Sequence, residues 1–246
     1  MIRGLYTAAT AMQAQQTAQD LIAQNLANVS TPGYRRQVAA THAFSTLVGQ
    51  SLTGSTPGNR TAESPPAITE VLSAGDPAQG AIRATGNATD LALNGDGFFV
   101  IQAPNGQETY TRDGAFTLDA NNHLVTADGN SVLGEHGPIT ITSADWAIDQ
   151  SGQVKCHGAI VDRLRLVSLP NFQAATRLGN NQWRASRTAP AARTQVLQGH
   201  LEGSNVNAVT EMVGMITAVR QFEANQRCIQ ALDSTLDHAV NDVGRA

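Results

Sequence analysis

Apolar positions in the first thirty residues recur at helical spacing. Between Gly4 and Asn28 there is no proline or internal glycine, and Asp20 is the only charge. Apolar or small residues return mostly every three or four positions, which is typical of a helix with one apolar face. This stripe comprises Leu5, Ala9, Met12, Ala18, Ile22, Leu26 and Val29. Glutamines replace the charged pairs of an ordinary exposed face, so we expect this helix to pack against other protein.

A second and longer helical pattern closes the chain, from about Ala208 to Val243. Its apolar positions alternate spacings of four and three, the period of a left-handed coiled coil. Asn207 is placed to cap this helix. The stripe comprises Met215, Val219, Phe222, Gln226, Ile229, Asp233, Leu236, Val240 and Val243, with Leu232 and Ala239 beside its two polar members. Such a helix cannot bury its stripe on itself, and the N-terminal helix is the first expected partner.

The middle of the chain has a different texture. Residues 45–90 are rich in Gly, Ser, Thr and Pro, which predicts either an extended linker with one or two short strands or, outside an assembly, plain disorder. From Leu91 onward, short apolar runs alternate with turn signals, which predicts hairpins. The segment beginning at Phe116 recurs in pattern from Trp146, and each copy should be a hairpin whose Asp caps the turn. Residues 163–169 alternate cleanly, which predicts one strand with one solvated face.

These patterns together predict an α+β fold. N- and C-terminal helices would form an α-helical coiled-coil layer, and a central domain would be mainly antiparallel β-sheet. We expect an N-terminal helix and turn at 1–34, an extended linker region at 35–90, a β domain at 91–200 and a C-terminal helix at 201–246.

Composition narrows the possible functions. The chain has 246 residues and a formal net charge of −4, which gives no reason to expect nucleic acid or an anionic membrane as a partner. Charged residues make up 15%, below the roughly 25% of an average soluble domain. No apolar run approaches a membrane span, and the first residues lack a cleavable signal pattern. We therefore expect no membrane insertion and no cleaved signal peptide.

The sequence offers no set of residues typical of a catalytic, cofactor or metal site. The six histidines are scattered, and none is spaced from another as metal ligands usually are. No serine, cysteine or threonine lies in a nucleophile-elbow pattern. Cys156 and Cys228 could pair, but two small buried side chains are the simpler interpretation. We expect no cofactor, no metal and no enzymatic activity.

Apolar helices at both ends and a β middle favour a subunit of an assembly, in which the helices supply the intersubunit packing. We assign this packing to Leu5, Met12, Ile22, Leu26, Val29, Met215, Val219, Phe222, Ile229, Leu236 and Val240. Two other classes remain open. One is a non-enzymatic binding or assembly module built on the β domain, which would need an exposed aromatic or charged patch. The other is an enzyme such as a hydrolase.

Three segments, in order along nearly the whole chain, resemble the flagellar axial proteins, the rod and hook family of the bacterial basal body. They are NLANVSTPGYRR (25–36), LNGDGFFVI with YTRDGAFTLDANNHLVTADGNSVLG (93–134), and LEGSNVNAVTEMVGMITAVRQFEANQR (201–227). The motif positions are Asn25, Asn28, Thr31, Pro32, Gly33, Tyr34, Ser204, Asn205 and Val206.

The resemblance implies a non-enzymatic subunit of the basal-body rod. Such a subunit polymerises into a helical periplasmic drive shaft that transmits torque to the hook for swimming motility, with both terminal helices in an inner coiled-coil layer. Its implied partners are itself, other rod and hook axial proteins, and the flagellar type III apparatus that exports it unfolded without a cleaved signal. The segments GEHGPITI (134–141) and LEGSNV (201–206) favour a proximal-rod subunit. The start of the chain is as similar to a distal-rod subunit, which stays the alternative.

The first of these segments also closes the N-terminal helix abruptly. Pro32 lacks a backbone N–H and biases Thr31 towards an extended conformation, so the helix is expected to end just before it. Pro-Gly favours the centre of a type II turn, in which Gly33 takes positive φ. We expect Tyr34 to anchor the departing chain on the helix packing and Asn28 to hold the corner by side-chain-to-backbone hydrogen bonds. The two following arginines would mark a return to solvent or an acidic neighbour.

Overall fold

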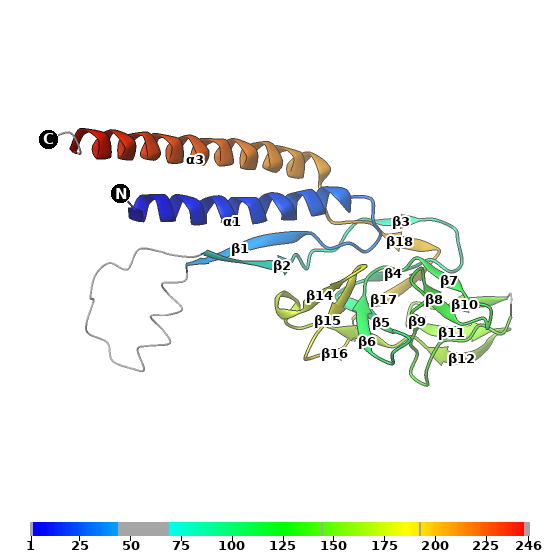
Figure 1. The fold of residues 1–246 in the computed structure, drawn as a ribbon. Coiled ribbons are helices and arrows are strands. Elements are labelled where there is room, and N and C mark those ends of the chain that lie inside the picture. Colours follow the sequence, from blue (N-terminus) through cyan, green and yellow to red (C-terminus); the bar gives the residue numbers. More distant parts are fainter. Residues whose placement is uncertain (1, 44–68, 144, 192, 244–246) are drawn as a thin grey trace. The chain divides into compact units, whose positions relative to one another are not determined.

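The computed structural model describes residues 2–43, 69–143, 145–191 and 193–243 (Figure 1). The chain divides into two compact units. The helical unit comprises Met1–Leu26, Gln37–Ala74 and Ala208–Ala246, and the β-domain unit comprises Ala27–Arg36 and Gly75–Asn207.

The helices are α1 (Ile2–Ala27), α3 (Ala208–Val243) and the short 3₁₀ helix η1 (Phe172–Ala174). The strands up to the middle of the β domain are β1 (Gln37–Ala43), β2 (Thr69–Gly75), β3 (Ile82–Ala84), β4 (Leu91–Asn94), β5 (Gly97–Gln102), β6 (Glu108–Thr111), β7 (Phe116–Leu118), β8 (Leu124–Thr126) and β9 (Ser131–Val132). The later strands are β10 (Trp146–Ile148), β11 (Gln153–Cys156), β12 (Ala159–Arg163), β13 (Leu166–Ser168), β14 (Thr176–Gly179), β15 (Gln182–Arg184), β16 (Ala189–Pro190), β17 (Gln195–Gln198) and β18 (His200–Glu202).

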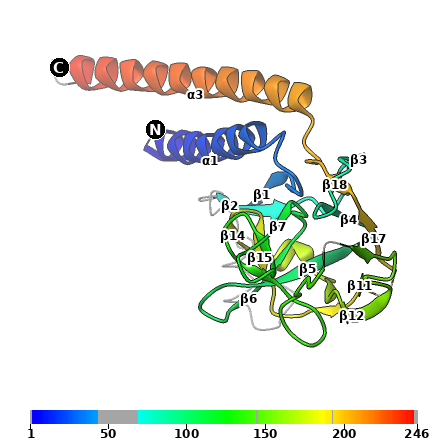
Figure 2. The ribbon, with the colours of Figure 1, turned by 90° about the vertical axis from the view of Figure 1, so that its right-hand side faces the viewer.

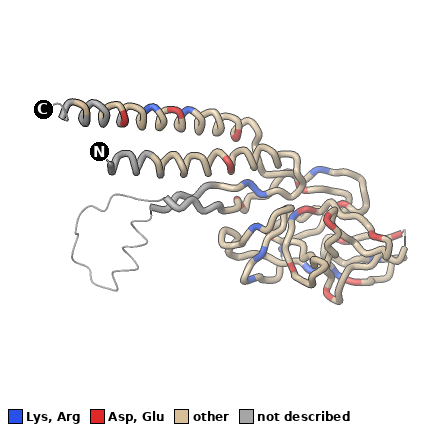
Figure 3. Tube along the Cα trace, viewed as in Figure 1, with Lys and Arg blue, Asp and Glu red and all other residues tan. Residues whose placement is uncertain are grey.

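In the helical unit, α1 and α3 lie side by side and run antiparallel (Figures 1 and 2). Near the start of α3, a Cβ added to Gly214 would lie 3.7 Å from Cδ1 of Ile22. Further along, Nε2 of Gln15 donates to the carbonyl oxygen of Ala218 at 3.2 Å. Charges are few along α1 (Figure 3), whose sequence contains Arg3 and Asp20. The glutamine-rich face therefore takes part in helix pairing through a neutral hydrogen bond.

The inward face of α3 keeps the expected heptad spacing but not all of the expected members. Met215, Phe222 and Ile229 are half-buried, as their place in the stripe suggests. Between them, however, Ala218 is buried and Val219 is 41% exposed. The expected positions Gln226 and Asp233 are also exposed. Ala218 lies three residues after Met215, and Val219 lies four. Because a period of 3.5 residues fits both steps equally well, the sequence could not show which of the two is buried.

The β domain is organised around β5, as Figure 2 shows from a second side. The largest sheet has the order β14-β15-β6-β5-β9-β8-β7, and β13 also pairs with β5 and with β16. Five successive residues of β5 are buried, from Gly97 to Ile101. A strand buried on both faces has no solvated side, so its sequence is a continuous apolar run. β5 therefore separates two cores.

The two cores contain alternate side chains of β5. Phe99 and Ile101 belong to the larger core, in which the rings of Phe99 and Phe116 meet edge to face at 5.1 Å between centroids. Phe98 and Val100 belong to the smaller core, together with Phe172. This alternation follows from the two-residue period of a strand.

The two hairpins expected from the repeated pattern are both present. β7 pairs with β8, and β10 pairs with β11, each antiparallel. In the first turn, Oδ1 of Asp119 accepts from the backbone N–H groups of Asn121 and His123. In the second, Oδ1 of Asp149 accepts in the same way from Ser151 and Gln153. The hydrogen bond from the Ser151 hydroxyl is the main reason why the pKa of Asp149 falls to about 2. The Asp-capped turn was thus correctly predicted.

Two details of the sequence interpretation need correction. Residues 163–169 do not form one strand, because β12 ends at Arg163 and β13 begins at Leu166. Leu164 between them is buried in the larger core. Cys156 is buried and Cys228 is exposed, and both are free thiols, so only the first is the small buried side chain that we expected.

Within the described residues, no helix has the length and apolar character needed to cross a membrane.

Candidate functional site

The candidate site is the place where the segments next to both terminal helices meet the β domain. Residues 27–36 and 203–207 belong to the β-domain unit. We call the contacts that fix them, centred on Glu202, the junction.

The N-terminal side of the junction is a tight turn. The backbone N–H of Tyr34 donates to the carbonyl oxygen of Thr31 at 3.4 Å, and Gly33 has φ of +65°. The positive φ expected for Gly33 in a type II turn is therefore observed. Helix α1 ends earlier than expected, at Ala27, and residues 28–33 form the turns and bend that lead into this corner.

Gly33 also lies against another part of the backbone. A Cβ at this position would lie 2.4 Å from the backbone carbon of Arg112 and 2.4 Å from the nitrogen of Asp113. The N–H of Gly33 donates to the carbonyl oxygen of Glu202 at 2.8 Å. Gly33 is thus required for its backbone conformation and for this close approach.

Glu202 is the centre of the junction, and its side chain is 1% exposed. One carboxylate oxygen accepts from Nη2 of Arg35 at 3.0 Å and from the backbone N–H of Gly80 at 3.0 Å. The other accepts from Nη1 of Arg112 at 2.8 Å. Through its side chain and its carbonyl oxygen, Glu202 ties together the corner, residue 80 and the end of β6.

The two arginines are buried almost as deeply. Their side chains are 1% and 2% exposed. Arg35 also donates to the carbonyl oxygens of Pro77 and Ala78, and Arg112 donates to those of Leu93 and Gly95. Burial lowers the pKa of Arg112 to about 10 against the opposing effect of Glu202. Burial also lowers the pKa of Arg35, and Glu202 opposes this effect.

The C-terminal side of the junction is held mainly by Asn205. Its Oδ1 accepts from the backbone N–H of Arg36 at 2.6 Å, and its Nδ2 donates to the carbonyl oxygen of Ala78 at 2.8 Å. The backbone N–H of Asn205 donates to the carbonyl oxygen of Tyr34 at 3.3 Å. Next to it, Oγ of Ser204 accepts from the N–H of Val206, whose side chain is buried. The motif residues at both ends of the chain therefore contact one another.

The other corner residues have distinct roles. Tyr34 is 1% exposed, and the guanidinium carbon of Arg177 lies 4.8 Å from its ring centroid. We expected Tyr34 to anchor the chain on the helices, and this contact anchors it on the β domain. Oγ1 of Thr31 donates to Oδ1 of Asn28 at 3.2 Å. The carbonyl oxygen of Pro32 accepts from Nδ2 of Asn181 at 2.9 Å.

Asn25 performs a related task inside the helical unit. Its Nδ2 donates to the carbonyl oxygen of Gln37 at 2.8 Å, and its Oδ1 accepts from the N–H of the same residue at 2.9 Å. Nδ2 also lies 3.4 Å from Oε2 of Glu211, the buried acid in the first turn of α3. Helix α3 begins directly after Asn207, as the sequence predicts. One side chain thus links the end of α1, the start of β1 and the start of α3.

Replacing Asn25 by alanine removes both bonds to Gln37 and is expected to destabilise the helical unit by about 1–3 kcal/mol, because each bond contributes about 0.5–1.5 kcal/mol. Asn25→Asp should cost more, since a carboxylate would face the carbonyl oxygen of Gln37 and the carboxylate of Glu211. Amide hydrogen exchange at Gln37 measures the effect. Gln16→Ala on the exposed side of α1 is the control. Unchanged protection of Gln37 in Asn25→Ala would contradict this role.

The packing residues expected from the sequence lie as follows. Met12, Ile22, Leu26 and Val29 are half-buried. Met215, Phe222 and Ile229 are half-buried on α3, and Val219 is exposed. The side chains of Leu5, Leu236 and Val240 lie outside the described residues.

Sequence reasoning missed the ion-pair cluster at the centre of the junction. Arg112 and Glu202 each lie inside a quoted motif, in YTRDG and LEGSNV, but no role was given to them. Arg35 was expected to meet solvent or an acidic neighbour, and Glu202 is that neighbour. The available signal was a charged residue within two positions of a glycine in each of the three motifs, in a chain poor in charge.

The junction has the chemistry of a structural clamp. Its two buried arginines share the carboxylate of Glu202, and all three side chains are also bonded to backbone atoms. In the part of the chain that the structure describes, no group of three or more His, Cys, Asp or Glu could hold a metal ion.

Comparison with known proteins matches the same three regions. The model of the flagella basal body rod protein family matches residues 5–35, and that of the flagellar hook protein FlgE/F/G D1 domain matches residues 92–156. The model of the flagellar basal body rod FlgEFG protein C-terminal region matches residues 197–242.

Whole-length relatives agree with these matches. The flagellar basal-body rod protein FlgG of Buchnera aphidicola subsp. Acyrthosiphon pisum is 33% identical over 257 residues, covering 96% of this chain and 98% of that protein. FlgF of Escherichia coli K12 is 34% identical over 263 residues, covering 97% of each. FlgG of Bacillus subtilis is 33% identical over 267 residues, covering 98% of this chain and 99% of that protein.

The chain is thus built of a helical unit and a β domain, with buried ion pairs at the junction. With these relatives the assignment becomes specific, because identity above 30% extends over nearly the full length of both partners. The chain belongs to the family of flagellar basal-body rod proteins and is a structural subunit of the flagellar rod.

Proposed function

We propose that the chain polymerises through its terminal helices into the helical drive shaft that crosses the periplasm and transmits torque to the hook. In this proposal, α1 and α3 form an inner coiled-coil layer with the helices of neighbouring copies and of other rod and hook axial proteins. The subunit reaches its place through the flagellar type III apparatus. The observation that carries the proposal is an apolar face of α3 that is exposed in the described part of the chain.

This exposed face covers the first turns of α3, opposite the side that packs against α1. Its members are Val209, Met212, Val213, Ile216 and Val219, which are 70%, 49%, 58%, 55% and 41% exposed. Their spacing places them on one side of the helix, and the first charge after buried Glu211 is Arg220. A contiguous apolar surface of this kind is a feature of interaction sites. It supports burial against another subunit.

The junction supports the transmission of torque. A drive shaft works only if the force carried by one part of each subunit reaches the rest of it. Buried, charge-assisted hydrogen bonds such as those of Glu202 have fixed geometry. They hold the segments next to both terminal helices rigidly on the β domain.

An aspartate on the exposed face tests the proposal. Val213→Asp is expected to leave the isolated subunit folded, with a stability change within about 0.5 kcal/mol, because the residue is already solvated. In the rod it would bury an uncompensated charge. We therefore expect loss of incorporation into basal bodies and loss of swimming in soft agar. Gln221→Asp, on the flank of the same helix, is the matched control. Normal motility of cells that carry Val213→Asp would overturn the proposal.

Within the rod, we propose a proximal position. The segments at 134–141 and 201–206 support it. The relatives named FlgG and FlgF match with similar identity, 33% and 34% in the two compared above. Sequence identity therefore does not distinguish a proximal from a distal position, and an experiment is needed. Basal bodies arrested at successive stages of rod assembly, probed with an antibody to the β domain, distinguish the two. A proximal subunit is present in the earliest rods, and its first appearance after later subunits would assign it to the distal rod.

A further inference from the structure

Charge is distributed unevenly along the part of the chain that forms the β domain. Residues 84–162 contain ten Asp or Glu and two basic residues, whereas residues 163–201 contain six arginines and neither Asp nor Glu. The arginine-rich segment supplies β14 and β15, and two views of the β domain place these strands on the opposite side from β11 and β12 (Figures 1 and 2). The two sides therefore differ in charge.

We call residues 176–187, the hairpin of β14 and β15 with the residues that follow it, the basic end. Arg184 and Arg187 are exposed, and the guanidinium group of Arg177 lies over the ring of Tyr34. Among the ion pairs between described residues, none includes any of these three arginines. The basic end therefore offers its positive charge to a partner.

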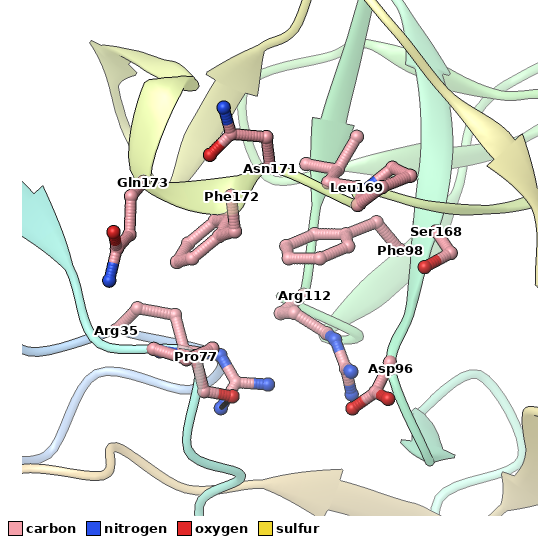
Figure 4. Close-up of a pocket in the computed structure, with 11 residues that line it drawn as sticks. Arg35, Pro77, Asp96, Phe98, Arg112, Ser168, Leu169, Asn171, Phe172 and Gln173 are labelled. Carbon is pink, nitrogen blue, oxygen red and sulfur yellow. Dashed lines mark hydrogen bonds between the residues drawn. The ribbon is translucent and has the colours of Figure 1, made fainter.

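The arginines of the junction differ from those of the basic end. Arg35 and Arg112 share the buried carboxylate of Glu202, and the side chain of Asp96 lies beside that of Arg112 (Figure 4). Acidic groups of the same domain thus already face the junction arginines.

We call the sheet β10-β11-β12, together with the loop at 134–137, the acidic end. The loop contacts the end of β12, because the backbone N–H of Glu135 donates to the carbonyl oxygen of Arg163 at 2.9 Å. Acidic residues outnumber basic ones here, with Glu135, Asp145, Asp149 and Asp162 against Lys155 and Arg163. Opposite charges of this kind steer association and disfavour wrong pairings.

Each end also exposes large apolar side chains on an edge strand. β14 ends the order of the nine-stranded sheet, and β12 ends that of the three-stranded sheet. Leu178 on β14 is 42% exposed, and Ile160 and Val161 on β12 are 60% and 45% exposed. Leu178 and Val161 are each skipped in the strand register, as the extra residue of a β-bulge is. A bulge interrupts the pairing and redirects a side chain, so both ends present apolar side chains instead of a flat edge.

We propose that the β domains of adjacent copies dock head to tail, with the basic end of one copy on the acidic end of the next. Leu178 packs against Ile160 and Val161, while Arg184 and Arg187 face the acidic residues. Contact between like ends would bring equal charges together, so two different surfaces meet, and such a contact continues from copy to copy. It rests on the proposed function, because the terminal helices bring the copies together.

Reversing one charge at each end tests this contact. Arg184→Glu and Asp145→Arg change exposed side chains, so neither should shift the urea unfolding midpoint of the isolated subunit. Each alone should lower the yield of rods in isolated basal bodies about fivefold, the size expected for one close surface charge pair. The double variant should restore the yield, because the opposite charges face each other again.

Arg83→Glu, an exposed position on β3 outside both ends, is the matched control and should leave the yield unchanged. A normal yield with Arg184→Glu, or a double variant with a yield no better than the single ones, contradicts the head-to-tail contact.

Cross-linking in assembled rods tests directly whether the two ends meet. Cys228→Ser removes the exposed native thiol, and the other cysteine, Cys156, is buried. In this background, the pair Leu178→Cys and Val161→Cys, treated with a short bismaleimide, should give a ladder of linked copies. Each single cysteine variant should remain monomeric.

The linked products distinguish the possible partners. Rods of normal yield without the ladder overturn the contact and leave the packing of the terminal helices intact. A product that contains another axial protein overturns the pairing between copies, and links in a single cysteine variant overturn the head-to-tail arrangement. Failure of the proposed function has a different signature, which is normal swimming of cells that carry Val213→Asp.

Discussion

Replacing Glu202 by glutamine is expected to lower the free energy of unfolding of the β domain by about 3–5 kcal/mol, because breaking a buried ion pair leaves an uncompensated charge in the interior. We expect the upper part of this range, since Arg35 and Arg112 both depend on this carboxylate. Urea unfolding followed by tryptophan fluorescence measures the effect. Both tryptophans of the chain, Trp146 and Trp183, lie in the β domain.

A surface ion pair of similar length provides the control. Glu108 and Arg165 are 2.9 Å apart, but their side chains are 37% and 44% exposed. Glu108→Gln should therefore cost less than about 1 kcal/mol. A double-mutant cycle adds a sharper test: Arg112→Met should cost less in the Glu202→Gln background than alone, because Arg112 is then surplus buried charge. If Glu202→Gln and Glu108→Gln lowered the free energy of unfolding equally, Glu202 would not be the stabilising centre of the junction.

Replacing Gly33 by alanine is expected to destabilise the β domain by about 2–5 kcal/mol. One part is the left-handed backbone conformation, which costs a side chain about 1–2 kcal/mol. The other part is the forced separation from Arg112 and Asp113, an overpacking effect of about 1–3 kcal/mol. The new Cβ would lie 2.4 Å from backbone atoms of these two residues. Backbone atoms cannot move aside as the end of a flexible side chain can. The same tryptophan measurement applies.

Gly106→Ala separates the two parts. Gly106 has φ of +80°, and a Cβ there would meet nothing within 4 Å. This variant should therefore show the conformational cost alone, about 1–2 kcal/mol. If Gly33→Ala cost no more than Gly106→Ala, the close approach at the corner would have no energetic role.

Local features of the fold were predictable from the sequence. The bounds of α3, from Ala208 to Val243, match the expected helix, because periodicity and an N-cap residue are local signals. The hairpins beginning at Phe116 and Trp146 were also predicted, since Asp-capped turns depend on neighbouring residues. The positive φ of Gly33 follows from the Pro-Gly pair in the same way.

Long-range features were not predictable, because nothing local encodes them. Glu202 pairs with Arg35 and Arg112 only after distant parts of the chain come together. The pairing of β13 with β5 is likewise a tertiary event. Because β13 pairs with β5 and Leu164 enters the larger core between β12 and β13, the alternating run at 163–169 does not form one strand. The side of α3 that faces α1 depends on packing that a 3.5-residue period leaves open.

In the wall of the rod, we expect the exposed apolar face of α3, from Val209 to Val219, to pack against neighbouring subunits. The most direct measurement is a reconstruction of isolated basal bodies by electron cryomicroscopy at side-chain resolution. We predict that Val209, Met212, Val213, Ile216 and Val219 lose most of their exposure to helices of adjacent subunits. A rod in which this face lines the lumen or meets solvent would contradict the account.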